Sequence, residues 1–504
     1  MTRKLLVAIM LITDSAPFGE GPMALPFQRP SMACRTFTSP LVEKVIEELG
    51  SRLVDKDMAR LFENAFPNTL DTTVRWHTDG TDSKKRYSSG KWDGPQSFIV
   101  TGDINAEWLR DSTNQLAQYQ PLAKKDKAIH NLILGAINTQ AEFIITSPYC
   151  NAFQPPPPSK LPPSQNGQGD TVHPAYEPTF VFECKYELDS LAAFLSLTNQ
   201  FHSHTGSKAF LTKRWSLALE TILAVLDEQS FGTFNQDGTF RKNEYTFQRQ
   251  TNTGTETLSL SGVGNPLAAG TGLIRSAFRP SDDATILGFL IPANAMITVE
   301  LQRTADMLAA TSGANKEVIA RLRRKAAAIK AAIYEHGVID HKKWGKVFAY
   351  EVDGYGSTIF MDDANLPSLL ALPLLGFVDV KDEIYQNTRT MILSKDGNPY
   401  YLAGRAFNGI GGPHIGPQHA WPMSLLVAAM TSDDDEEIMT NLALVKKSAQ
   451  LGLIHESVNV NSVRDYTRSW FAWANSVFAQ TVLDLAERKP HLLFGKGAEA
   501  YVVE

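Results

Sequence analysis

Acidic, basic and tryptophan side chains stand close together where several loops of this sequence run into apolar helical stretches. The clearest case is TGDINAEWLRDS at 101–112, which contains Asp103, Trp108, Arg110 and Asp111. Carboxylates and guanidinium groups can hold hydroxyls by charge-assisted hydrogen bonds. A flat indole ring can carry the C–H face of a sugar while its N–H finds a polar partner. These residue types therefore suit the binding of a carbohydrate.

Four further junctions have the same character. They are SAFRPSDDATILGF (276–289), IFMDDANLPSLLALP (359–373), FNGIGGPHIGPQHAWPMSL (407–425) and LIHESVNVNSVRDYTRSWFAWANS (453–476). Each has a purely structural interpretation: Ser281 can cap a helix whose first turn holds Asp282 and Asp283, and His414 and His419 can be core histidines. Five such junctions are harder to explain in this way, because each uncompensated buried charge costs several kcal/mol. Their concentration indicates a functional site.

Glycoside hydrolysis is the chemistry that these residues fit. It needs one protonated carboxylic acid for the leaving oxygen and a second carboxylate that activates water or attacks carbon. The sequence carries no metal-ligand motif, no nucleophile elbow and no glycine-rich phosphate loop that would point to another reaction. The tandem Asp282 and Asp283 can raise the pKa of one of the two carboxyls, whereas a helix N-terminus would lower it.

The bulk composition limits the partners. The chain has 504 residues, 20% of them charged, and a formal net charge of −6 without a Lys/Arg cluster, which argues against nucleic acid. No later apolar run is long enough to span a membrane. Residues 1–35 are predicted to be an irregular N-terminal segment. Arg3 and Lys4 precede an apolar run at 5–12 that resembles a secretory signal, which favours the secretory pathway or the cell exterior over the cytoplasm.

Three cysteines are present, Cys34, Cys150 and Cys184, and their spacings match no zinc motif. A bridge between Cys150 and Cys184 can form across the Pro-rich segment 151–170, and free thiols are equally compatible with the sequence. That segment, NAFQPPPPSKLPPSQNGQGD, predicts a polyproline stretch followed by polar coil, a surface loop or lid.

Helical periodicity recurs along the chain, whereas strand patterns are scarce. Helices are predicted at 40–63, 104–119, 124–146, 185–203, 207–228, 281–311, 315–336, 363–374, 378–394, 417–431, 434–451 and 468–488, and hairpins at 231–251 and 347–356. No fixed period supports a solenoid. Alternation of polar-faced and apolar helices favours an all-α (α/α)6 barrel, a six-hairpin toroid with short β-hairpin insertions. We predict one catalytic domain over 36–490 and a tail over 491–504.

Seven motifs, in order, resemble glycoside hydrolase family 125, the exo-acting α-1,6-mannosidases. They are GDINAEWLRDS, KYELDSL, FRPSDDA, MDDANLPSLLALPLLG, GIGGPH, AWPM and YTRSWFAWANS, between about Phe37 and Leu485. The resemblance implies an (α/α)6 barrel that removes non-reducing terminal mannose with inversion, without metal or cofactor, from a mannose-containing oligosaccharide or glycan. The Pro-rich segment is longer than expected for bacterial members, which points to a eukaryotic, fungal member with a modified rim.

The resemblance also implies roles for individual residues. The general acid is Asp283 or its neighbour Asp282, and motif spacing favours Asp283. The general base is Glu456 of the HES motif, and inversion requires the two carboxyls to lie about 6.5–9.5 Å apart. The implied substrate-binding residues are Arg110 and Asp111 at the pocket floor, Asp103 and Trp108 close by, and Arg279, His414, Arg468 and Trp470 as further hydroxyl-holding or wall residues.

Two alternatives keep the same fold: another inverting (α/α)6 α-glycosidase of the α-glucoside type, and a non-catalytic glycan-binding relative. The paired Asp283 and Glu456 argue against the second, because a lectin needs no acid and base. An isoprenoid cyclase would need a DDxxD motif. Asp362 and Asp363 are followed by Ala364, Asn365 and Leu366, so that motif is absent.

Overall fold

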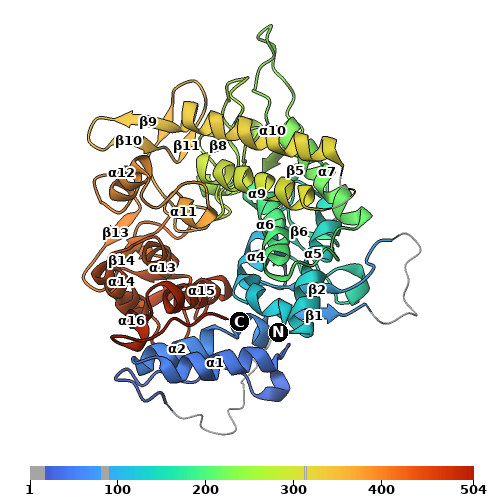
Figure 1. Ribbon diagram of the computed structural model, residues 1–504. Coiled ribbons are helices and arrows are strands. Elements are labelled where there is room, and N and C mark those ends of the chain that lie inside the picture. The colour runs from blue at the N-terminus through green and yellow to red at the C-terminus, as the bar shows by residue number, and fades with distance from the viewer. Residues whose placement is uncertain (1–17, 81–89, 312, 314, 504) are drawn as a thin grey trace, which may run out of the picture.

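The computed structural model describes residues 18–80, 90–311, 313 and 315–503 (Figure 1). The predicted secretory signal lies outside these residues. Within the described part of the chain, no helix is both long and apolar enough to cross a membrane. The longer helices are α1 (Pro40–Arg52), α2 (Lys56–Ala65), α4 (Leu109–Ala117), α5 (Lys127–Thr146), α6 (Leu188–Thr205), α7 (Lys213–Glu228), α9 (Ile291–Ala309), α10 (Lys316–Ala332), α12 (Glu383–Ile392), α13 (Pro422–Met430), α14 (Asp435–Ser448) and α15 (Ala472–Arg488).

Five of these helices form an inner arc. Helix α13 packs on α15, α15 on α4, α4 on α6, and α6 on α9 (Figure 1). A second layer covers them: α14 lies on α13, α5 on α6, α10 on α9, and α2 and α16 (Pro490–Phe494) on α15. Residue type decides the layer, because the apolar α13 is buried from Pro422 to Ala429, whereas the Arg/Lys-rich α10 buries a single face. The predicted, mainly helical, two-layered character is confirmed.

Three helices differ from the prediction. The single helix predicted at 40–63 is instead two helices, α1 and α2, because Leu53 is extended and the carboxylate of Asp55 caps the start of α2. The helix predicted at 281–311 begins only at Ile291, because the chain turns sharply at Asp282, whose φ is +65°. Ser281 therefore does not cap a helix. The helix predicted at 363–374 is reduced to α11 (Leu372–Leu375), because the buried carboxylate of Asp362 accepts the backbone N–H groups of Leu369 and Leu370 at 2.8 and 2.9 Å and holds a turn instead.

Short strands lie where the loops meet the inner helices. Strands β3 (Glu107–Trp108), β8 (Phe289–Leu290) and β15 (His419–Ala420) run directly into α4, α9 and α13. Each belongs to a three-stranded sheet, completed by β4 (Ala152–Phe153) and β6 (Val181–Glu183), by β11 (Glu351–Val352) and β12 (Thr358–Ile359), and by β16 (Ser457–Asn459) and β17 (Ser462–Thr467), respectively. These sheets fix the backbone at the N-terminal ends of the inner helices.

The two predicted hairpins are only partly local. Across the Asp237–Gly238 turn a single bridge joins Phe234 to Phe240, while β7 (Thr246–Gln248) pairs with the distant β5 (Thr171–His173). Phe247 of β7 is buried edge-to-face on Phe278 at 4.9 Å, so tertiary packing outweighs the local turn. Strand β10 (Gly345–Phe348) pairs back with β9 (Val338–His341). The Asp353–Gly354 turn predicted within 347–356 does join an antiparallel pair, but of β11 with β12.

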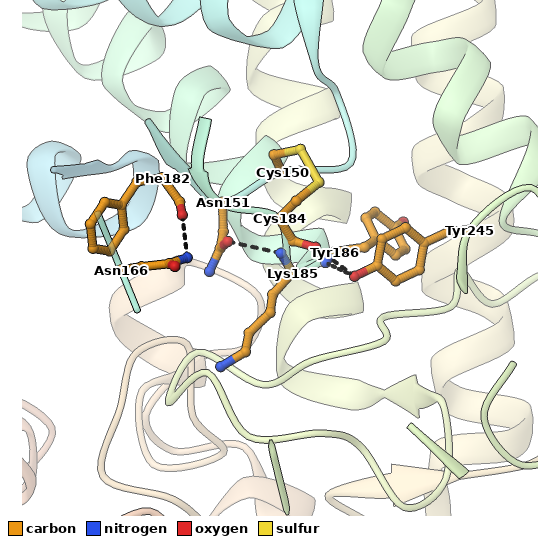
Figure 2. Close-up of a disulfide and its surroundings, with 8 residues drawn as sticks. All are labelled: Cys150, Asn151, Asn166, Phe182, Cys184, Lys185, Tyr186 and Tyr245. Atoms are coloured by element: carbon orange, nitrogen blue, oxygen red, sulfur yellow. Dashed lines mark hydrogen bonds between the residues drawn. A yellow bond between two sulfur atoms is a disulfide. The ribbon is translucent and has the colours of Figure 1, made fainter. Parts of the chain in front are cut away.

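A disulfide joins Cys150 to Cys184, which resolves the alternative that the sequence leaves open, and Cys34 is free and exposed. The bridge is buried and lies between β4 and β6 (Figure 2). Directly beyond it, the backbone N–H of Lys185 donates to Oδ1 of Asn151 at 3.0 Å.

The hydroxyl of Tyr245 supports the same point from the other side. It donates to the carbonyl oxygen of Cys184 at 2.9 Å and accepts the backbone N–H of Tyr186 at 3.0 Å (Figure 2). The disulfide and Tyr245 thus fix the backbone at Asn151 and Lys185.

We predict that the denatured, unreduced protein has one reactive thiol, and three after reduction. Thiol titration measures both numbers, and Cys34→Ser should lower each by one. Reduction should also lower the midpoint of thermal unfolding, because a cross-link of this kind contributes about 2–4 kcal/mol. Three reactive thiols before reduction would contradict the bridge.

Candidate active site

A hollow of about 420 Å³ lies at the N-terminal ends of the inner helices, and we call it the inner hollow. Its lining is Thr101, Ile104, Trp108, Arg110, Asp111, Pro280, Ser281, Asp282, Asn365, His414, Trp421, Glu456, Arg468, Phe471 and Trp473. An outer hollow of about 1320 Å³ adjoins it and shares Ile104, Trp108, Asp282, His414 and Arg468.

Glu456 and Arg468 flank the β16–β17 hairpin. Ser457 pairs with Thr467 at its open end, which brings the next two residues together. Nε of Arg468 donates to Oε1 of Glu456 at 3.1 Å, and the same guanidinium bonds the carboxylate of Asp103. The hairpin therefore sets a guanidinium against the carboxylate of Glu456, inside the inner hollow.

The backbone of Arg468 is held in an unusual conformation, with φ +54°. A non-glycine residue adopts this region only where its surroundings enforce it. His455 supplies the constraint: its Nδ1 bonds the carbonyl oxygen of Arg468 at 2.9 Å, and its ring stacks on Tyr466 at 3.8 Å. Burial lowers the pKa of His455, which favours the neutral ring. The histidine of the HES motif therefore positions Arg468.

Asp282 extends into the inner hollow from a backbone that is also left-handed. Its Oδ1 accepts Nε1 of Trp108 at 3.2 Å and Nδ2 of Asn151 at 3.1 Å, and lies 3.5 Å from a guanidinium nitrogen of Arg110. Asn151 is the residue fixed by the disulfide. Its Nδ2 also donates to Oε1 of Glu187 at 3.1 Å, so one amide contacts two carboxyls.

Asp283 lies differently, although it is adjacent in sequence. Its Oδ2 accepts the hydroxyl of Ser281 at 2.9 Å and lies 3.6 Å from Nδ1 of His414, and it lines the outer hollow only. Burial opposes the charged ring of His414, but the close negative charge of Asp283 outweighs it and raises the pKa of His414 to about 9. His414 is therefore a cation at neutral pH.

Arg110 is the centre of the buried charge. It is 3% exposed and forms ion pairs with Glu187, with Asp189 at 3.3 Å, and with Asp111 and Asp282 at 3.5 Å each. Its guanidinium carbon also lies 5.4 Å from the ring centre of Trp473. Three of these acids, Asp111, Glu187 and Asp189, are buried, so burial favours their protonated forms in spite of the nearby guanidinium.

The pKa shifts of the four acids differ in direction. Burial, despite the charge of Arg110, raises the pKa of Asp111 to about 7 and that of Asp189 to about 6. Burial, helped by the charge of Asp282, raises the pKa of Glu187 well above its ordinary value. Burial alone would raise the pKa of Asp282 too, but Arg110 and Lys185 hold it below its usual range. The pKa values of the neighbouring Glu187 and Asp282 are therefore shifted in opposite directions.

Several buried polar atoms of the lining have no hydrogen-bond partner among the described residues. They include Oδ2 of Asp111 and Nε1 of both Trp421 and Trp473. Buried polar groups are normally hydrogen-bonded, so such atoms mark places where a ligand's polar groups are received. An acceptor and two indole donors around one hollow suit a ligand rich in hydroxyl groups.

The structure brings most of the sequence-predicted site residues together. Trp108, Arg110, Asp111, Asp282, His414, Glu456 and Arg468 line the inner hollow, and Asp103 and Asp283 line only the outer one. Two residues lie elsewhere. Arg279 is buried behind the site, where its Nε donates to Oε1 of Glu351 at 2.6 Å, and Trp470 packs over Gly102 and lines neither hollow.

Sequence reasoning did not identify several lining and supporting residues. They are Asn151, Glu187, Asn365, Trp421, Phe471 and Trp473. All but Asn151 lie inside the quoted motifs, so their neighbours gave a usable signal. Asn151 gave none, because it opens the Pro-rich segment and its role depends on a disulfide across 34 positions.

Proteins that resemble this chain in sequence and structure agree with a carbohydrate site. A family model described as metal-independent α-mannosidase (GH125) matches residues 55–483. The Meiotically up-regulated gene 157 protein of Schizosaccharomyces pombe is 57% identical over 476 residues, which cover 94% of this chain and 91% of that protein. A solved Streptococcus pneumoniae metal-independent α-mannosidase, in a non-productive complex with α-1,6-mannobiose, is 32% identical with a TM-score of 0.77, and the match covers 89% of this chain and 99% of that one.

The helical fold and the acid-lined hollow, together with these likenesses, define a glycoside hydrolase. Among the described residues, no cluster of three or more His, Cys, Asp or Glu side chains is arranged to hold a metal ion. The chain belongs to glycoside hydrolase family 125, the family of metal-independent α-mannosidases.

We predict that Arg110→Met lowers the free energy of unfolding by about 3–5 kcal/mol at pH 7.5, because it leaves buried acids without their cation. At pH 5 the loss should be smaller. Without Arg110 these acids must be protonated in the folded chain, and protonating them costs less as the pH approaches their unfolded pKa.

Denaturant titration at both pH values measures this loss. Arg321→Met is the matched control, because Arg321 pairs with two half-exposed acids, Glu220 and Asp227, and should cost about 1 kcal/mol or less. Equal losses for the two variants would contradict the assigned role of Arg110.

Proposed function

We propose that the protein is an exo-acting α-1,6-mannosidase that releases non-reducing terminal mannose with inversion and without a metal ion. The observation that carries the proposal is that Asp282 and Glu456, 174 positions apart in the chain, line one hollow together. The likeness to a family member solved with α-1,6-mannobiose supports the linkage. The orphaned polar atoms of Asp111, Trp421 and Trp473 suit the hydroxyls of one terminal sugar.

In the proposed reaction Asp282 donates a proton to the glycosidic oxygen as the bond from that oxygen to C1 breaks. Glu456 takes a proton from a water molecule whose oxygen forms a bond to C1 from the opposite face. The product is β-mannose, and the proton gained by Glu456 is finally returned through solvent to the acid. Arg468, whose Nε donates to Oε1 of Glu456 at 3.1 Å, orients this carboxylate toward the water.

We assign the role of general acid to Asp282, although motif spacing favours Asp283. Asp282 lines both hollows and so lies at their junction, where a bond between a bound terminal sugar and its leaving group would be. Asp283 is engaged with Ser281 and His414. In this proposal the neighbouring Glu187, whose pKa burial raises well above its ordinary value, supplies the proton that Asp282 needs, since one amide of Asn151 holds both carboxyls together.

Two broader features belong to the same proposal. We propose that the inner arc closes as an (α/α)6 ring, with the short α11 beside α9 in the sixth inner place. We also propose that the protein works in an oxidising compartment, on the secretory route or outside the cell. The buried Cys150–Cys184 bridge supports this location, because such bridges persist mainly in oxidising surroundings.

The pure protein should cleave α-1,6-mannobiose, and proton NMR should detect β-mannose first. Initial α-mannose would overturn inversion. Cleavage of α-1,2- or α-1,3-mannobiose alone would overturn the linkage. Cleavage of glucobioses in place of mannobioses would favour the α-glucosidase alternative, and binding without any cleavage would favour a glycan-binding relative. Glu456→Gln serves as the inactive control.

Leaving-group dependence separates the two acids. Asp282→Asn should lower kcat/KM for α-1,6-mannobiose by about 10²–10⁴-fold, but far less for a dinitrophenyl α-mannoside, whose leaving group needs no proton. Glu456→Gln should lower both, because water must still be activated. A similar loss on both substrates for Asp282→Asn would contradict its role as the acid.

Asp283→Asn is the matched neighbour variant. It should not show this leaving-group dependence. Because it removes the charge that keeps His414 protonated up to about pH 9, the alkaline limb of kcat/KM should move to lower pH. If Asp283→Asn shows the leaving-group dependence instead, the acid is Asp283.

A further inference from the structure

The Pro-rich segment, predicted as a surface loop or lid, is pinned to the mouth of the site. Near its middle, Nε2 of Gln154 donates to the carbonyl oxygen of Ser164 at 2.7 Å, and the backbone N–H of Ser164 returns a bond to Oε1 of Gln154 at 2.9 Å. Nδ2 of Asn105 donates to the hydroxyl of Ser164 at 3.1 Å. Asn105 belongs to the loop that leads into α4, so the segment is attached directly to the site.

Its far end is held as firmly. Nδ2 of Asn166 donates to the carbonyl oxygen of Phe182 at 2.6 Å (Figure 2). Asp170 is gripped at both carboxylate oxygens by Arg249, at 2.7 and 2.8 Å, and Arg249 also bonds Glu183 at 2.8 Å. A segment held at several points is already ordered, so little conformational entropy is lost when a ligand binds to it.

This segment forms one side of the outer hollow. Ser164, Gln165, Asn166 and Gln168 line the outer hollow and not the inner one. Thr253, Thr255 and Glu256 of another loop also line it. The side-chain amides of Gln165 and Gln168 bond no other group in the described part of the chain, and both residues are exposed. Amides and hydroxyls of this kind bind sugar hydroxyls.

The charges of the outer hollow indicate a neutral ligand. Each cation that lines it already has an acidic partner: Lys185 with Glu183, Arg249 with Asp170 and Glu183, His414 with Asp283, and Arg468 with Glu456 and Asp103. A phosphate or carboxylate would have to compete with these pairs. An uncharged polyol would not.

We propose that Ser164–Gln168 form a binding site for a neutral sugar unit on the leaving-group side, beyond the unit next to the bond that is cleaved. This inference rests on the proposed function. The residues shared by both hollows lie at the cleavage junction, and Gln165 and Gln168 belong to the outer hollow alone, so they contact a sugar farther along the chain. The preferred substrates are then α-1,6-linked mannosides of three or more units.

The test is the double variant Gln165→Ala/Gln168→Ala, assayed on α-1,6-mannotriose, α-1,6-mannobiose and a dinitrophenyl α-mannoside. We expect kcat/KM for the trisaccharide to fall by about tenfold relative to that for the aryl mannoside, as for the loss of one or two hydrogen bonds. Mannobiose should show a smaller relative loss. Gln450→Ala, an exposed glutamine outside both hollows, is the matched control and should leave all ratios as in the wild type.

The outcomes separate this inference from the proposed function. If the wild type cleaves mannosides and the double variant leaves the trisaccharide ratio unchanged, the sugar site on Ser164–Gln168 is overturned and the function stands. If the wild type cleaves no mannoside, the proposed function fails. Calorimetric titration of α-1,6-mannotriose into Glu456→Gln, with and without the double variant, then decides the site: equal affinity for both proteins would overturn it, and about tenfold weaker binding by the double variant would support it.

Discussion

The buried guanidinium of Arg110 is the constraint on which the site depends. Four carboxyls surround it, from the starts of α4 and α6 and from the turn before β8. Burial raises the pKa values of Asp111, Glu187 and Asp189 around this one guanidinium. In the proposed mechanism, these raised pKa values supply a proton next to the general acid. The cost of burying these groups is offset by the apolar inner helices, whose packing fixes Arg110 from below.

Backbone geometry completes the arrangement on both sides of the hollow. Asp282 and Arg468 both adopt positive φ without being glycine. Each is held by neighbours that the short sheets position: Asn151 and Trp108 at β4 and β3, and His455 next to β16. Strain of this kind collects at functional sites because the surroundings, and not the residue's own preference, decide the conformation. The small sheets at the ends of the inner helices therefore serve the chemistry more than the core.

Much of this was readable from the sequence, and the failures have definite physical causes. Helical periodicity located most helices, because one apolar face recurs wherever a helix packs on a core. It failed at 281–290 and 363–371, where Asp282 and Asp362 take conformations or backbone hydrogen bonds that periodicity does not encode. Motif order placed Trp108, Arg110 and Glu456 in one hollow. It could not show that Arg279 faces Glu351, or that Asn151 contacts both Asp282 and Glu187, because those contacts depend on how distant loops meet.

The packing of α15 against α4 has a consequence for how the chain is made. The bond between Arg468 and Asp103 joins residues 365 positions apart, and Trp473 of α15 covers Arg110 of α4. During vectorial synthesis on the ribosome, α4 and α6 emerge long before α15 exists. The nascent chain must therefore carry its acidic cluster open to water until nearly the last helix is translated. Only then is the cluster shielded from water. The raised pKa values of its carboxyls therefore arise late, together with the assembly of the fold.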